Sequence, residues 1–226
     1  MIEMQLDVVD VVARRVTPKL VQICQTDAKG LIPSQSQADL DKMLGILSDW
    51  PGSFDMDSVA ATLYTRWYIQ FIRNLYLRYG FTEEDRMAFS DNYHFTDAFQ
   101  NIIESILVEK EKSHFQIICE GSYPDNAPKG LSNHCAYQIA MALLDAKEFL
   151  ERNVSADVKD WAWGRNHVMD YTNLPFSKTI LKPLFHRSVP VPGNSNTPFF
   201  AKISERKNRD EGLITSTAAG GLKMVI

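Results

Sequence analysis

Cysteine is scarce in this sequence, and its spacing excludes two kinds of small domain. The 226 residues contain three cysteines, Cys24, Cys119 and Cys135, and none of them stands in a C-x-x-C pair. An odd number without paired spacing argues against a disulfide framework and excludes a zinc ribbon. One pair can still form a single bridge, and the sequence leaves that pairing open.

An excess of positive charge is also missing. The chain has 24 Lys and Arg residues against 28 Asp and Glu residues, which gives a formal net charge of -4. A protein that binds nucleic acid needs a basic face to neutralise phosphates. We therefore expect no nucleic-acid partner.

Long hydrophobic runs are absent as well. A membrane-spanning helix needs roughly 18 or more consecutive apolar residues, and charged residues interrupt every apolar run here. We therefore expect no membrane span. The first residues, which include Glu3 and Asp7, lack the basic start and the apolar run of a signal peptide. The compartment of the protein stays open.

The residues that are present are those of a globular chain, with 45% hydrophobic and 23% charged residues. Apolar residues recur at three- and four-residue spacing through the first two thirds, which predicts helices. Pro18 falls inside the first of these and is expected to kink or restart it. The predicted helices cover Leu6–Leu20, Gln37–Leu47, Val59–Tyr79, a segment that begins near Asp91 or Thr96 and ends at Leu107, and Tyr137–Asn153.

The last third of the chain has a different character, because prolines divide it into short extended pieces. Two runs are typical of strands, Phe199–Ile203 and Leu222–Ile226. The second run is the end of the chain, and we expect the sequence to be a piece of a longer polypeptide. In that case both strands would lack their sheet partners and would expose apolar edges. We divide the chain into a helical part (1–115), a loop and helix (116–160) and a loop-rich part with strands (161–226).

Standard catalytic motifs are not found. The five histidines form no H-E-x-x-H pair, and no glycine-rich phosphate loop is present. Ser195 stands in a segment that begins like a G-x-S-x-G nucleophile elbow, but Thr197 replaces the final glycine, which favours a polar turn. Asn153 begins an N-x-S glycosylation pattern, which matters only in a secretory compartment.

His167 is the histidine with the most distinctive surroundings, since Trp161, Trp163 and Gly164 precede it closely. A buried tryptophan needs an acceptor for its indole N–H, and a buried histidine can donate to a backbone carbonyl. We predict that this segment holds the loop Pro190–Thr197 against the helices. An enzyme that pairs His167 with an acid such as Asp170 remains an alternative.

Four segments together resemble the penicillin amidase (penicillin acylase) family. They are LSDWPG followed by DSVAATLY (47–52 and 57–64), WAWGRNH (161–167), PVPGNSNT (190–197) and the final GLKMVI (221–226). These are similar to the family's L-x-x-W-D-G and D-S-x-A-A-x-x-[YF], W-x-W-G-x-x-H, and P-x-x-G-[DGN]-x-x-T patterns, in the same order. Pro51 departs from the family's aspartate, and Phe199-Phe200 departs from its usual Val-Asn.

The resemblance implies an N-terminal-nucleophile hydrolase of α+β class, mainly helical here, that forms part of a four-layer αββα fold. In this family a freed Ser, Thr or Cys attacks an amide and its own α-amino group is the base. Penicillins, cephalosporins and acyl-homoserine lactones are family substrates, which links the family to antibiotic metabolism. Members are often periplasmic or secreted, and calcium is possible in the full-length fold.

The matched segments all belong to the C-terminal half of the family's beta chain, so residues 1–226 form a partial penicillin-amidase-like domain. Gly52-Ser53 and Gly121-Ser122 lack the sequence context of a maturation site. We therefore assign no catalytic residue, cofactor ligand or metal ligand to this chain. Its partners would be the remainder of the beta chain, the alpha chain of the same precursor and, in the intact enzyme, a small amide. The matched residues are assigned to a structural motif: Trp161, Trp163, Gly164, His167, Gly193, Asn194 and Thr197.

These observations leave three interpretations. The first is a fragment of an amide hydrolase that is inactive alone because it lacks the nucleophile. The second is a helical binding or scaffold protein derived from that family. The third is the unrelated small enzyme built on His167.

Overall fold

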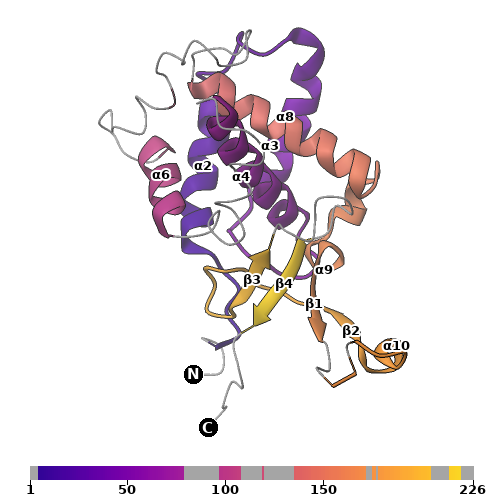
Figure 1. Ribbon diagram of the computed structural model, residues 1–226. Coiled ribbons are helices and arrows are strands. Elements are labelled where there is room, and N and C mark those ends of the chain that lie inside the picture. Colours follow the sequence, from indigo (N-terminus) through magenta and orange to yellow (C-terminus); the bar gives the residue numbers. More distant parts are fainter. Residues whose placement is uncertain are drawn as a thin grey trace.

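The computed structural model describes residues 5–78, 97–107, 119, 135–171, 175–176, 178–204 and 214–219. Helices form one end of the molecule and a small sheet forms the other (Figure 1). The fold is therefore α+β and mainly helical, as expected. The longer helices are α2 (Val11–Gln25), α3 (Gln37–Leu47), α4 (Val59–Arg78), α6 (Asp97–Leu107) and α8 (Cys135–Asn153). The short helices are η1 (Ser34–Ser36), η2 (Val158–Trp161), α9 (Trp163–Asn166) and α10 (Lys182–Phe185).

The helical end is organised around α4, which packs against α8 (Figure 1). Trp67 of α4 is fully buried, and its indole N–H donates to the carbonyl of Ile139 at 3.1 Å. Tyr68 and Phe71 of the same helix are also buried, so the aromatic side chains of α4 form part of the core. Trp67 stacks on Phe71 with 5.7 Å between ring centroids. Every helix in the described ranges is too short or too polar to cross a bilayer.

The helix predictions are accurate where the apolar repeat is long. The predicted bounds of α3 match the observed ones, and α8 ends at Asn153 as predicted. The prediction for the first helix is wrong at its start. The helix begins at Val11, because Asp10 caps it, and it includes Pro18, so the predicted restart at Pro18 does not occur.

The sheet has four strands in the order β2-β1-β4-β3. Strand β1 pairs in antiparallel fashion with β2 and in parallel fashion with β4, and β4 pairs in antiparallel fashion with β3. The strands are β1 (His167–Tyr171), β2 (Arg187–Pro190), β3 (Ala201–Ser204) and β4 (Ile214–Ala219).

The predicted strand near Phe199 corresponds to β3, but the expectation that it lacks a partner is wrong. Strand β3 pairs with β4 in antiparallel fashion, and Ala201 and Ile203 of β3 are buried. The predicted strand Leu222–Ile226 lies outside the described residues, as do Gly121-Ser122 and the histidines His94, His114 and His134.

The cysteine pairing that the sequence left open is Cys119 with Cys135. This disulfide ties residue 119 to the first residue of α8. Cys24 is free and buried, and burial raises the pKa of its thiol to about 12. A thiol in that state is protonated at neutral pH and is a poor nucleophile.

Candidate functional site

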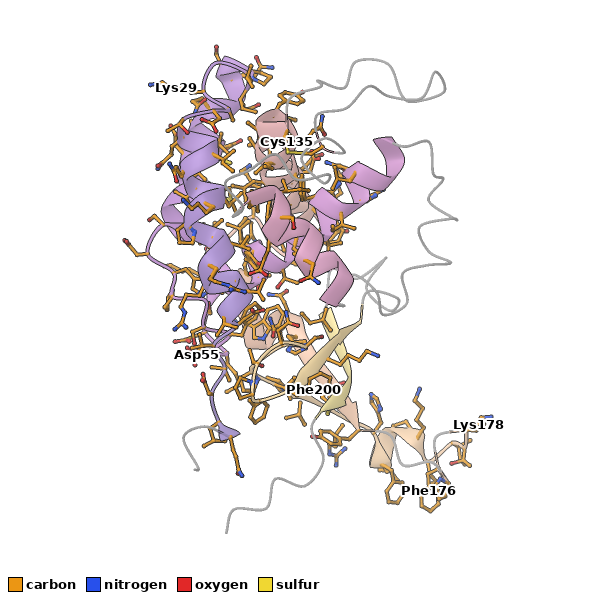
Figure 2. The ribbon with its side chains drawn as sticks, turned by 90° about the vertical axis from the view of Figure 1, so that its left-hand side faces the viewer. Lys29, Asp55, Cys135, Phe176, Lys178 and Phe200 are labelled. Carbon is orange, nitrogen blue, oxygen red and sulfur yellow. A yellow bond between two sulfur atoms is a disulfide. The ribbon has the colours of Figure 1, made fainter. Side chains whose placement is uncertain are left out.

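The segment 161–167 docks against the loop 53–58 that precedes α4. The backbone N–H of Trp163 donates to the carbonyl of Ser58 at 3.1 Å, and the N–H of Gly164 donates to the carbonyl of Met56 at 2.7 Å. A side chain at Gly164 would bring its Cβ within 2.9 Å of the Met56 Cβ. Glycine is needed there because the two backbones approach so closely. In Figure 2 the label of Asp55 marks this loop, between the helices and the sheet.

Gly193 joins the same place from the C-terminal third of the chain. Its N–H donates to the carbonyl of Phe54 at 2.9 Å, and its carbonyl accepts from the indole N–H of Trp163 at 3.0 Å. Its φ is +74°, and a Cβ there would lie 2.2 Å from the carbonyl oxygen of Phe199. Glycine is therefore required at position 193, both because of the positive φ and because a side chain has no space.

His167 is fully buried beneath this contact. Its Nδ1 lies 3.0 Å from the carbonyl oxygen of Val191, and its ring centroid lies 4.4 Å from that of Trp163. A carbonyl only accepts, so Nδ1 carries the proton. Burial lowers the pKa of His167 to about 4, and backbone hydrogen bonds with Val191 and Lys202 oppose that shift only in part. The imidazole is therefore neutral at pH 7.

Asp10 closes the arrangement from the N-terminal side, although the sequence analysis did not select it. The residue is 2% exposed, and its carboxylate accepts four hydrogen bonds. Oδ1 accepts from the backbone N–H groups of Val12 and Ala13 at 2.8 and 3.0 Å. Oδ2 accepts from the side-chain amides of Asn194 and Asn196 at 2.8 and 3.0 Å. Its position directly before an apolar helical repeat was the available signal, since aspartate is a preferred N-cap.

Residues 194–197 form a tight polar turn, as predicted for the Ser195 segment. The N–H of Asn196 donates to Asn194 Oδ1 at 2.7 Å, and the N–H of Asn194 donates to Thr197 Oγ1 at 2.9 Å. The Ser195 hydroxyl accepts from the N–H of Ile203 at 3.1 Å. Ser195 is therefore part of the connection to β3, and no described base activates it as a nucleophile.

We call this arrangement the junction: Asp10, Phe54, Trp163, His167 and Gly193–Thr197. It brings together five of the seven residues assigned to the structural motif, and Gly164 lies at its edge. Trp161 lies apart, because its indole N–H donates to the carbonyl of Ser155 at 2.8 Å, next to the end of α8. Asn196 is a further junction residue that the sequence analysis did not select.

The junction has the chemistry of a structural contact. The Val191 carbonyl occupies Nδ1 of His167, so an acid such as Asp170 does not bond to that nitrogen. The other ring nitrogen, Nε2, is buried and has no hydrogen-bond partner. Within the described ranges, no group of three or more His, Cys, Asp or Glu side chains could hold a metal ion. Asp10, whose oxygens already accept four N–H groups, does not fit as a calcium ligand.

The comparison with protein families gives a match over the whole sequence. The model of the penicillin amidase family matches residues 1–226. A search of curated proteins found no match.

Proposed function

The chain belongs to the penicillin amidase family, and from that premise we propose that it is the C-terminal part of the beta chain of an amide hydrolase. The reaction is hydrolysis of the carbon–nitrogen bond of a linear amide. The nucleophile is the first residue of that beta chain, in the part that precedes the residues described here, and this chain is inactive alone.

The observation that supports this proposal is that the junction bonds to its own chain. The carboxylate of Asp10, the indole N–H of Trp163, Nδ1 of His167 and the backbone of Gly193 all bond to other groups of this chain, and Nε2 of His167 is buried without a hydrogen-bond partner. A nucleophile needs a base within hydrogen-bond reach that is free to take its proton. His167 is fully buried, and no hydroxyl or thiol of the described residues bonds to its unpartnered Nε2. Burial also raises the pKa of the Cys24 thiol, which therefore stays protonated at neutral pH.

In the intact enzyme, the family resemblance implies that an N-terminal Ser, Thr or Cys attacks the amide carbonyl. Its own α-amino group takes the proton and then donates it to the leaving amine. The contribution of this chain is positional. The junction connects the helices to the sheet, and we propose that this sheet continues into the stacked sheets of the four-layer fold. A calcium ion of the full-length fold would take its ligands from outside the described residues.

The test is to compare the chain alone with the chain reconstituted with the remainder of the beta chain, which begins with Ser, Thr or Cys, and with the alpha chain. The substrate is an N-acyl nitroanilide, whose cleavage releases a coloured amine. We expect no turnover from the chain alone and turnover from the complex, unchanged by Ser195→Ala. Turnover by the chain alone would contradict the proposal. No turnover from either sample, with the complex intact, would favour the scaffold protein.

A further inference from the structure

A small cavity of about 30 Å³ lies where α4 packs against α8. In the described part of the chain, four residues of α4 at helical spacing and two residues of α8 line it. Gln70, Arg73 and Phe149 are partly exposed, so a small molecule can enter from the surface. The lining residues are Arg66, Ile69, Gln70, Arg73, Ala146 and Phe149.

Arg66 brings a buried charge to this cavity. The residue is 5% exposed, and its guanidinium lies over the ring of Phe149, 4.2 Å from the ring centroid. This cation–π contact uses one face of the planar group, whereas the five N–H donors point outward in its plane. Groups of the chain and a bound molecule can therefore share the guanidinium. The contact also fixes its orientation, which reduces the entropy lost when a ligand binds.

The described lining of the cavity is positively charged. Arg73 adds a second guanidinium, two helical turns after Arg66 on the same face of α4, and none of the described lining residues is acidic. Asp145 of α8 accepts from the side-chain amide of Asn74 at 3.0 Å and is not a lining residue. The cavity therefore favours an anion over a cation.

The size of the cavity indicates which anion fits. A water molecule needs about 10–15 Å³ of such space, so the cavity has room for about two atoms of that size. A carboxylate has two oxygens in one plane and matches the edge of a guanidinium, whereas a phosphate has four oxygens in a tetrahedron. Ile69, Ala146 and Phe149 provide apolar contacts for the rest of the acid.

We propose that this cavity binds a small carboxylate that has an apolar substituent. The carboxylate oxygens accept from Arg66 and Arg73, and the substituent contacts Phe149 and extends toward solvent. A neutral apolar molecule fits less well, because it would take water from two guanidinium groups without offering them an acceptor. The inference goes beyond the proposed function, since binding requires neither the nucleophile nor turnover.

The first test measures binding of benzoate to the full chain by isothermal titration calorimetry. Benzamide is the uncharged comparison of nearly the same shape. We expect benzoate to bind at least tenfold more tightly, because hydrogen bonds between charged groups are stronger than those to a neutral amide.

The matched variants are Arg73→Gln and Arg14→Gln, each of which removes one positive charge. Arg73 is chosen because it is only partly buried, whereas Arg66 belongs to the interior. Arg73→Gln should weaken the binding of benzoate at least tenfold and leave that of benzamide unchanged. Arg14 is exposed on α2, and its replacement should leave both affinities unchanged. A folded Arg73→Gln variant with unchanged affinity for benzoate would overturn the proposal.

The second test locates the ligand without any variant. Crystals of the chain are soaked with 4-bromobenzoate, and the anomalous scattering of bromine marks its position. We expect the carboxylate within hydrogen-bond distance of Arg66 and the bromine on the solvent side of Phe149. Bromine at another place on the molecule would contradict the assignment of the cavity.

Each remaining outcome also overturns the proposal. Equal affinities for benzoate and benzamide would make the cavity an apolar site, and tighter binding of inorganic phosphate than of benzoate would make it a site for a tetrahedral anion. An equal loss in the two variants would reduce the effect to overall charge. A ligand seen in the crystal without measurable binding in solution would mean binding at crystal concentration only. None of these measurements involves turnover, so their failure is distinct from failure of the proposed function.

Discussion

The junction and the segment 175–190, the arm, which contains α10 and β2, use their side chains in opposite ways. In the junction His167 is fully buried and bonds to Val191, the residue that follows β2. At the arm Tyr171 faces Arg187, and both are exposed. The junction directs its polar groups inward, toward partners in this chain, whereas the arm directs apolar groups into water. The first region therefore maintains the fold, whereas the second contributes little buried apolar area to it.

The largest effect should come from the junction glycine. Gly193→Ala places a Cβ 2.2 Å from the Phe199 carbonyl oxygen at a φ of +74°. Left-handed strain costs about 1–2 kcal/mol for a non-glycine residue, and displacement of the backbone adds to it. We expect a loss of more than about 4 kcal/mol in the free energy of unfolding, measured by urea denaturation.

The matched control is Gly45→Ala on α3, where a Cβ would meet no atom within 4 Å. Alanine should stabilise this exposed helix position by about 0.5–1 kcal/mol. The two glycine variants should therefore differ in sign. If Gly193→Ala and Gly45→Ala both changed the free energy of unfolding by a small amount, a side chain at position 193 would be tolerated, and the backbone contact with Phe199 would not be as close as the structure shows.

Removal of the junction carboxylate should have the next largest effect. Asp10→Ala leaves the N-terminal N–H groups of α2 and the amides of Asn194 and Asn196 without their acceptor. We expect a loss of about 3–4 kcal/mol in the free energy of unfolding, since bonds to a buried charge are strong and a cap is lost too. Asp41→Ala, at an exposed position of α3, should change it by less than about 0.5 kcal/mol. A similar loss in both variants would argue against a special role for the junction.

The comparison also explains which parts of the fold could be predicted from the sequence. Helices α3, α4 and α8 have long apolar repeats, and their positions follow from them. Strand β2 is exposed along its whole length and β4 reads Ile-Thr-Ser-Thr-Ala-Ala, so neither shows the alternation that marks a half-buried strand. Asp10 bonds to Asn194 across 184 positions of sequence, a contact that local patterns do not encode.

The pH dependence of stability should report on His167. The unfolded side chain has a pKa near 6.5, and burial lowers the folded pKa to about 4. The stability from a neutral buried imidazole is complete above pH 6.5 and is lost as the pH falls toward 4, because the unfolded state binds the proton first. We expect a loss of about 2–3 kcal/mol over this range. The variant His167→Gln should lack this component, so the stability difference between the two proteins should narrow below pH 6.5. Identical pH profiles would contradict a buried neutral histidine.

A structural role for His167 also predicts how stability and turnover change together. His167→Ala should cost about 1–3 kcal/mol, because the carbonyl of Val191 loses its donor. In the active complex, turnover should fall only as far as the folded fraction falls. A melting curve like that of the original protein, combined with a thousandfold loss of turnover, would make His167 a catalytic residue instead.

The smallest effect on stability should come from the arm. Leu184 is 66% exposed and Ile180 is 95% exposed, so aspartate at either position removes little buried apolar area. We expect the double variant Ile180→Asp/Leu184→Asp to change the free energy of unfolding of the chain alone by less than about 0.5 kcal/mol, measured by the same urea titration. Binding of a hydrophobic dye should decrease, because the exposed apolar cluster is then interrupted by charge. A large loss of stability would show that the arm packs on its own chain. The contrast with the junction would then fail, since both regions would serve the fold.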